Sequence, residues 1–137
     1  MMIDSFTGEY GFLSNFYPCP IELDGELYPS VEHAFQAAKT DDFSMRWLIM
    51  NASTAGAAKK FGRTAPLRKG WDEMRVEVMR GLLKQKFRYL PLAQKLRDTG
   101  EAELIEGNWW GDQFWGVCHG KGKNHLGRLL MEIRKEL

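Results

Sequence analysis

The sequence predicts an α+β fold that is mainly helical and has a small β-hairpin component. Apolar residues recur at helical spacing in several segments, and one short segment alternates between apolar and polar residues as paired strands do. The length of 137 residues fits one compact domain over residues 1–137. A chain of this length buries about two-thirds of its unfolded surface, so we expect a core without disulfides or a structural metal.

The first predicted elements are a β-hairpin and the helix that follows it. Residues 21–28 alternate around Asp24 and Gly25, a pair typical of two-residue hairpin turns. Ser30 is placed to cap a helix whose apolar residues follow at i, i+3, i+4 and i+7. The predicted buried stripe of this helix contains Val31, Ala34, Phe35 and Ala38.

Two short helices are predicted after residue 40. The first begins at Asp41 or Asp42 and turns an apolar stripe toward the core. The residues that we expect to be buried on this stripe are Met45, Leu48 and Ile49. The second helix is rich in alanine, with Ser53 as its candidate cap and Gly62 at its end.

Three further helices are predicted in the second half of the chain. The longest covers residues 71–89, and the next has Pro91 at its first position and ends at Gly100. Residues 104–122 are rich in aromatic residues and glycine, which favours strands and loops. Asn124 is placed to cap the last helix. The face that this helix is expected to bury contains Leu126, Leu129, Leu130, Ile133 and Leu137.

Charge is distributed unevenly along the chain, although the net charge is only +1. Residues 1–58 carry 2 basic and 8 acidic side chains, residues 59–97 carry 12 and 3, and residues 98–137 carry 5 and 7. The middle segment therefore has a net charge of +9. This pattern fits a basic face for phosphates or nucleic acid, and it equally fits a solvated helix surface.

Composition and cysteine usage favour a cytoplasmic protein. Cys19 and Cys118 have no CxxC spacing, which suits a reducing compartment. The first residues lack the regions of a signal peptide, and no apolar run is long enough to span a bilayer, so we expect no membrane attachment. The histidine and cysteine spacing gives no support for a metal site.

Glu32 is the first candidate for chemistry. It lies in the opening turn of its predicted helix, and Gln36 and Lys39 follow at i+4 and i+7 on the same face. The helix N-terminus favours an ionised carboxylate, which can orient a water molecule or stabilise a developing positive charge. The alternative is that Glu32 only complements the helix dipole.

A glycine-rich segment before the last helix is the second candidate. Residues 116–124 read Gly-Val-Cys-His-Gly-Lys-Gly-Lys-Asn and lead directly into that helix. Glycine backbone amides and a helix N-terminus can hold an anion, and Lys121 and Lys123 add positive charge. The spacing is not that of a Walker loop, and a flexible connector is the alternative interpretation.

A tryptophan-rich segment is the third candidate. The chain has five tryptophans, and Trp109, Trp110 and Trp115 lie close together in the sequence. Indoles beside glycine and charged residues can stack on a purine or pyrimidine ring, so we expect two of the five at a binding site. The alternative is that most of them belong to the core.

Three separated segments together resemble the NADAR family, the YbiA-like N-glycosidases. They cover residues 11–18, residues 28–39 and residues 112–131, and residues 62–71 fit the central region of the family. The resemblance extends in order over nearly the whole chain. It implies a hydrolase without metal or other cofactor that cleaves the N-glycosidic bond between a ribosyl carbon and a base.

The resemblance also implies substrates and residue roles. Substrates would carry an ADP-ribosyl or phosphoribosyl group, such as ADP-ribosylated guanine in DNA or phosphorylated riboflavin-pathway intermediates. The implied catalytic residues are Glu32, Asp112 and Trp71. The implied substrate-binding residues are Ser14, Asn15, Phe16, Gln36, Lys39, Arg63, Arg68, Trp115, Gly116, Gly120, Lys121, Gly122 and Asn124.

The chemistry of the bond assigns a role to each group. Cleavage builds positive charge on the sugar. Glu32 would stabilise this charge or activate the water molecule that attacks the sugar carbon. Asp112 would hold sugar hydroxyls, while Trp71 and Trp115 would clamp the base. A non-catalytic module that binds ADP-ribose or a nucleotide, and a general nucleic-acid-binding domain, remain the alternative functions. The sequence does not indicate which oligomeric state the protein has.

Overall fold

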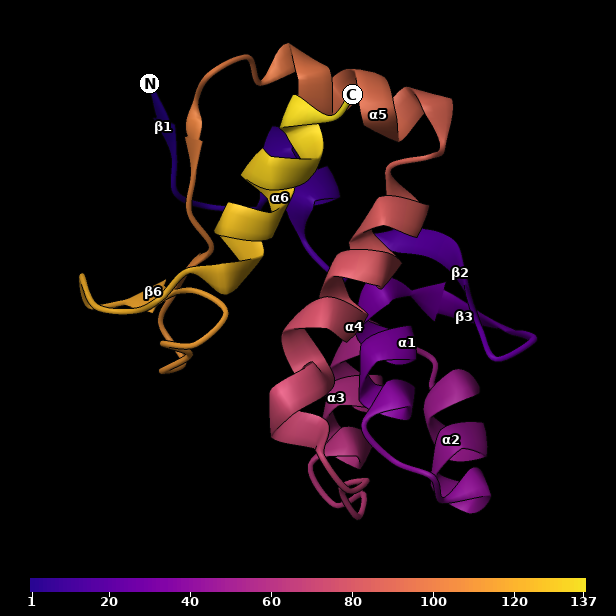
Figure 1. Ribbon diagram of the computed structural model, residues 1–137. Coiled ribbons are helices and arrows are strands. Elements are labelled where there is room, and N and C mark those ends of the chain that lie inside the picture. The colour runs from indigo at the N-terminus through magenta and orange to yellow at the C-terminus, as the bar shows by residue number, and fades with distance from the viewer. The chain divides into compact units, whose positions relative to one another are not determined.

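The computed structural model describes residues 1–137 and confirms a mainly helical α+β fold with three small two-stranded sheets (Figure 1). The chain forms two compact units. One comprises residues 1–14 and 87–137, and the other comprises residues 15–86. No helix is long and apolar enough to cross a membrane.

The unit of residues 15–86 opens with the predicted hairpin. Strands β2 (Pro18–Leu23) and β3 (Glu26–Ser30) pair antiparallel, with a register irregularity near the start of β2. Asp24 and Gly25 have φ angles of 50° and 85°. Positive φ at both central residues is what a type I′ turn requires, which explains why this dipeptide sets the hairpin.

Helix α1 (Val31–Ala38) is the central helix of the same unit. It begins where predicted, because the Ser30 hydroxyl accepts a hydrogen bond of 3.1 Å from the backbone N–H of His33. The helix contacts both hairpin strands and helices α2, α3 and α4. All eight of its residues are buried, so the face opposite the predicted apolar stripe is buried as well.

Helix α2 (Phe43–Met50) has the predicted cap but not the predicted buried stripe. Asp42 Oδ1 accepts a hydrogen bond of 3.0 Å from the N–H of Met45. Only Ile49 is buried, whereas Met45 is half-buried and Leu48 is 38% exposed, so the predicted burial of those two residues is wrong. This two-turn helix contacts α1, α3 and β3, and its large apolar residues Phe43, Trp47 and Leu48 stay exposed.

Helix α3 (Ala55–Gly62) ends at the predicted glycine, but its cap is not Ser53. The Thr54 hydroxyl accepts a hydrogen bond of 3.0 Å from the N–H of Ala57. A capping side chain must stand three residues before the amide that it satisfies. Ser53 lies one residue too early for a helix that begins at Ala55, so the structure corrects the cap to Thr54.

Helix α4 (Trp71–Lys86) ends three residues before the predicted Tyr89. The following helix, α5 (Leu90–Asp98), uses Tyr89 as its N-cap with φ −66° and ψ 122°. A residue cannot be helical in α4 and extended at the start of α5, so the cap ends the preceding helix early. Pro91 is the second residue of α5 rather than its first, and Gly100, with φ 63°, follows its end as expected.

The unit of residues 1–14 and 87–137 contains two pairs of parallel strands. Strand β1 (Met2–Ile3) pairs with β4 (Glu103–Leu104), and β5 (Gly107–Asn108) pairs with β6 (Val117–Cys118). The 3₁₀ helix η1 (Gly8–Leu13) contacts α5. The strands after residue 102 confirm the prediction of strands and loops in this aromatic, glycine-rich segment.

Helix α6 (His125–Lys135) contacts β4 and α5. Four of the five predicted core leucine and isoleucine residues are buried, but Leu137 lies beyond the helix and is 40% exposed, so its prediction is wrong. Asn124 precedes the helix without capping it through its side chain. That side chain instead donates to the Leu104 carbonyl and accepts from the Glu106 N–H, both at 2.9 Å, which ties the segment after β4 to the start of α6.

Candidate active site

The Glu32 side chain is buried and held in place within the unit of residues 15–86. It is 8% exposed, and its Oε2 accepts a hydrogen bond of 2.6 Å from Gln36 Nε2. The backbone N–H of Glu32 donates to the Asn15 carbonyl at 3.0 Å. The packing of α1 among five neighbouring elements explains why this charged helix face is removed from water.

Two buried amide oxygens of this unit have no hydrogen-bond partner. Asn15 Oδ1 and Gln36 Oε1 are both buried and accept no hydrogen bond, while Asn15 Nδ2 donates to Met79 Sδ at 3.6 Å. A buried acceptor without a donor costs about 1–3 kcal/mol. Both oxygens are therefore acceptors that the protein itself leaves unused.

Gly62 sets how closely α3 approaches the Gln36 side chain. A Cβ atom at this position would stand 1.9 Å from Gln36 Oε1. Only glycine leaves room for the amide in its present place. The end of α3 thus helps to fix Gln36, and through Gln36 it fixes Glu32.

Lys39 interacts electrostatically with the Glu32 carboxylate and with two further basic side chains. Burial lowers the pKa of Lys39, the Glu32 carboxylate partly opposes this shift, and Lys59 and Arg63 lower the pKa further. Lys39 therefore lies close enough to Glu32, Lys59 and Arg63 to be influenced by the charge of each. The arrangement combines a buried anion with positive charge that can attract a phosphate.

Three other predicted site residues of this unit, Arg68, Trp71 and Phe16, contact other parts of the same unit. Arg68 donates its backbone N–H to the Lys39 carbonyl at 2.8 Å, and its guanidinium donates to the Ala38 carbonyl at 3.4 Å. Trp71 is 5% exposed and packs on Phe35 with ring centroids 5.2 Å apart. Its indole is therefore not exposed for stacking on a base. The half-exposed Phe16 lies beside the start of α3.

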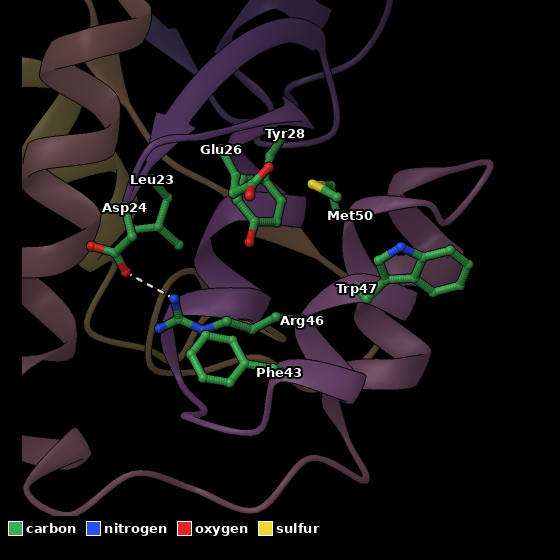
Figure 2. Close-up of a pocket in the computed structure, with 8 residues that line it drawn as sticks. All are labelled: Leu23, Asp24, Glu26, Tyr28, Phe43, Arg46, Trp47 and Met50. Atoms are coloured by element: carbon green, nitrogen blue, oxygen red, sulfur yellow. Dashed lines mark hydrogen bonds and ion pairs between the residues drawn. The ribbon is translucent and has the colours of Figure 1, made fainter.

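An open groove lies between the hairpin and α2, and none of the predicted site residues lines it. Figure 2 shows its lining side chains, with Arg46 and Asp24 joined by an ion pair of 2.8 Å. The groove has a volume of about 280 Å³. The residues that line it are Leu23, Asp24, Glu26, Tyr28, Phe43, Arg46, Trp47 and Met50.

In the other unit, Asp112 organises a turn. Its Oδ1 accepts hydrogen bonds from the backbone N–H groups of Phe114 and Trp115, at 3.1 and 2.9 Å. Its own backbone N–H and carbonyl are both bound by the side chain of Asn108. The carboxylate therefore positions the residues that follow it, including the predicted binding residue Trp115.

The amides at the start of α6 are already used by the protein. The N–H groups of Lys123, Asn124, His125 and Leu126 donate to the carbonyls of residues 113, 116, 114 and 115, at 2.9–3.3 Å. This hydrogen bonding leaves those four amides unavailable to an anion. Positive charge in this segment is instead offered by side chains, with Lys121 and Lys123 both exposed.

The glycines of the same segment mainly allow close packing. A Cβ at Gly116 would meet Glu106 Oε2 at 1.8 Å, and a Cβ at Gly122 would meet the Gly116 carbonyl oxygen at 2.1 Å. Gly120, with φ 75°, has no atom near its Cβ position and is exposed. The remaining predicted residue of this unit, Ser14, is half-buried and donates its backbone N–H to the Gly11 carbonyl.

Glu106 is a carboxylate that sequence reasoning did not select. It accepts a hydrogen bond of 3.0 Å from Asn108 Nδ2 and packs against Gly116. No spacing or motif distinguishes it in the sequence, because its neighbours are brought to it by the pairing of β5 with β6. No group of three or more His, Cys, Asp or Glu side chains is arranged to hold a metal ion.

The fold is that of a solved α+β protein of the N-glycosidase class. The NMR structure of the Escherichia coli protein YbiA superposes with a TM-score of 0.84 and 40% sequence identity, covering 98% of this chain and 84% of that one. The profile of the NADAR domain matches residues 4–137, through both compact units. The chain belongs to the NADAR family.

Curated relatives support the same classification. N-glycosidase YbiA of Escherichia coli strain K12 is 42% identical over 137 residues, which cover 97% of this chain and 85% of that protein. N-glycosidase Npun_R5314 of Nostoc punctiforme is 37% identical, with coverage of 93% and 86%. Riboflavin biosynthesis protein VVA0006 of Vibrio vulnificus is 43% identical over 93% of this chain, but this chain spans only 36% of that longer protein.

Proposed function

We propose that this protein is an N-glycosidase that hydrolyses the bond between a ribosyl carbon and a base in a phosphate-bearing, nucleotide-like substrate. One observation carries the proposal: the Glu32 carboxylate is buried and accepts a hydrogen bond from Gln36, whose own amide oxygen lacks a donor. The names of relatives that this chain matches over most of their length support the reaction class.

The proposed reaction separates charge at the sugar. As the carbon–nitrogen bond breaks, positive charge develops on the ribosyl ring, and the bonding electrons leave with the base. Water supplies a hydroxyl to the sugar carbon and a proton to the departing nitrogen. Glu32 stabilises the sugar cation or activates this water, and its exclusion from solvent strengthens either interaction.

Other groups of the unit of residues 15–86 hold the substrate. Asn15 Oδ1 and Gln36 Oε1 accept hydrogen bonds from sugar hydroxyls, which would satisfy both oxygens. Lys39 and Arg63 attract the phosphate. In the unit of residues 1–14 and 87–137, Asp112 positions the backbone of Trp115, and Lys121 is an exposed cation.

Two substrate classes fit this chemistry. Phosphorylated riboflavin-pathway intermediates are favoured by the name of the Vibrio vulnificus relative. ADP-ribosylated guanine in DNA carries the same type of ribosyl–base bond and has phosphates on either side. The two buried, reduced cysteines fit a reducing compartment such as the cytoplasm.

The test is release of free base by the wild-type protein and by Glu32→Gln. The substitution keeps the shape of the side chain and removes its charge, so turnover should fall about 10²–10³-fold. Chromatography after incubation with a phosphorylated riboflavin precursor, and separately with ADP-ribosylated DNA, measures the base. Glu26→Gln, an exposed change on the hairpin, is the matched control and should leave turnover unchanged.

Other outcomes would assign a different function. Full turnover by folded Glu32→Gln would remove this residue from the mechanism. Stabilisation by ADP-ribose without base release from either substrate would identify a non-catalytic binding module. Binding to many DNA sequences with a steep dependence on salt, and no hydrolysis, would identify a general nucleic-acid-binding domain.

A further inference from the structure

We infer that the loop carrying Trp109 and Trp110 is a surface on which the base of a nucleotide stacks, within the unit of residues 1–14 and 87–137. The inference rests on the proposed function for the nucleotide-like class of the ligand. Trp109 is 82% exposed and Trp110 is 49% exposed. The tryptophans that the sequence favoured as clamps are less available, since Trp71 is buried and Trp115 packs on Phe114 at 4.8 Å between ring centroids.

The loop that presents these indoles is braced by side-chain hydrogen bonds. Asn108 Oδ1 accepts from the Asp112 N–H at 3.0 Å, and Asn108 Nδ2 donates to the Asp112 carbonyl at 2.8 Å. The same nitrogen contacts Glu106 Oε2 at 3.0 Å. The side-chain amide of Asn108 thus joins the two ends of the loop of residues 108–112 by two hydrogen bonds, so that the indoles project from a fixed loop.

The geometry of the two rings suits a flat ligand. Their centroids lie 5.6 Å apart with an interplanar angle of 87°, so that the two indoles stand at right angles. A planar heteroaromatic ring can stack on one indole while its edge meets the other. Stacking on an exposed aromatic residue is largely independent of the identity of the base, because every base offers a π-face.

Charge next to the loop favours a nucleotide over an apolar protein segment. Asn108 pairs with Cys118 across the small sheet, and Cys118 forms a bridge with Lys121. One end of this sheet therefore carries both the indole loop and an exposed lysine. An indole surface with a neighbouring cation matches the two parts of a nucleotide, a flat ring and a phosphate.

The decisive experiment compares ligands with and without a base. Binding of GMP, UMP and ribose 5-phosphate is measured calorimetrically for the wild type, Trp109→Ala and the Trp109→Ala/Trp110→Ala double variant. We expect the wild type to bind both nucleotides more tightly than ribose 5-phosphate. The double variant should bind the nucleotides about tenfold or more weakly, with ribose 5-phosphate binding unchanged.

Trp47→Ala is the matched control, because Trp47 is 61% exposed on α2 in the other compact unit. It should bind all three ligands as the wild type does. The inference is overturned if the wild type does not prefer GMP or UMP over ribose 5-phosphate. It is equally overturned if folded Trp109→Ala and the double variant bind nucleotides as Trp47→Ala does, or if they change only the oligomeric state.

This equilibrium measurement separates the inference from the proposed function, since it needs no turnover. Normal nucleotide binding by Glu32→Gln with lost hydrolysis is the result expected if both are correct. Weakened nucleotide binding in the tryptophan variants, together with full turnover by Glu32→Gln, would retain the stacking surface and reject the proposed mechanism. The reverse pattern would retain the mechanism and reject the stacking surface.

Discussion

At the residue scale, Glu32 and Asp112 show that the same functional group can have two different tasks. One carboxylate oxygen of Glu32 accepts a hydrogen bond from Gln36, whose amide oxygen lacks a donor. One carboxylate oxygen of Asp112 accepts hydrogen bonds from two backbone N–H groups of its own turn. The sequence placed Glu32, Gln36 and Lys39 on one helix face, and the structure brings them together. It could not reveal the turn at Asp112, because that turn depends on a non-helical loop conformation.

Gly62→Ala should lower activity through the Gln36 amide. The added methyl group would occupy the present position of Gln36 Oε1, so the amide would move and its hydrogen bond to Glu32 would be strained or lost. A hydrogen bond to a charged group contributes about 1.5–3 kcal/mol, so we expect kcat/KM to fall by about 10–100-fold. Steady-state base release measures this change.

Gly56→Ala is the matched control for that substitution, since it lies on the same helix and a Cβ there meets nothing closer than 3.9 Å. It should retain full activity. Equal activity of the two alanine variants would show that the position of the Gln36 amide does not matter for turnover.

Lys86 should make stability depend on pH. Its side chain is fully buried, and burial lowers its pKa from 10.5 to about 7 despite the opposing influence of Cys19. Between these two values the unfolded chain binds a proton that the folded protein does not, so the free energy of unfolding rises with pH. The slope from this single group approaches about 1.4 kcal/mol per pH unit.

Lys86→Met should remove that slope. Urea unfolding at pH 6.5, 7.5 and 8.5 measures the difference in stability between wild type and variant, which should shift in favour of the wild type as pH rises. Lys84→Met, at an exposed position of the same helix, should follow the wild-type slope. Parallel curves for wild type and Lys86→Met would show that Lys86 titrates normally in the folded protein.

At the element scale, helix existence was predictable and helix ends were less so. All six α-helices were predicted, some from apolar spacing and others, such as α3 and α5, from capping residues, proline and glycine at their ends. The observed end of α4 lies three residues before the predicted one, and the observed cap of α3 lies one residue after the predicted one. Both depend on which residue adopts an extended backbone beside the helix. Periodicity could not predict the complete burial of α1, because that burial results from five elements packing around one helix.

Thr54→Ala and Ser53→Ala test the corrected cap of α3. Loss of the Thr54 hydroxyl leaves the Ala57 N–H without its acceptor, so the free energy of unfolding should fall by about 1 kcal/mol. Ser53→Ala removes a hydroxyl one residue earlier and should change stability by less than about 0.5 kcal/mol. Urea denaturation compares the two, and equal losses would reject the assignment of Thr54 as the cap.

At the scale of the whole molecule, the near-neutral net charge hides a strongly basic segment. Residues 59–97 carry 12 basic and 3 acidic side chains, and Lys59 and Arg63 of this segment act on Lys39 near Glu32. The sequence predicted this basic segment. Which of its charges lie near the carboxylate could not be predicted, because α1 and α3 meet only in the folded unit.

Added salt should therefore weaken binding of a phosphate-bearing substrate. We expect KM to rise several-fold between 50 and 300 mM salt, while kcat changes little, because ions screen attraction between charges that reach solvent. A dephosphorylated form of the same substrate is the control and should show a smaller change in KM. Equal salt dependence for both forms would indicate that the basic side chains do not contact phosphate.

The complete enclosure of α1 also bears on how this protein can diversify. Each of its eight positions meets other side chains, so a replacement chosen to alter reactivity disturbs packing at the same time. New specificities should therefore arise more readily from changes in the exposed loops than from changes in residues 31–38. A saturation library scored separately for soluble yield and for turnover should find few α1 variants that keep the first and lose the second.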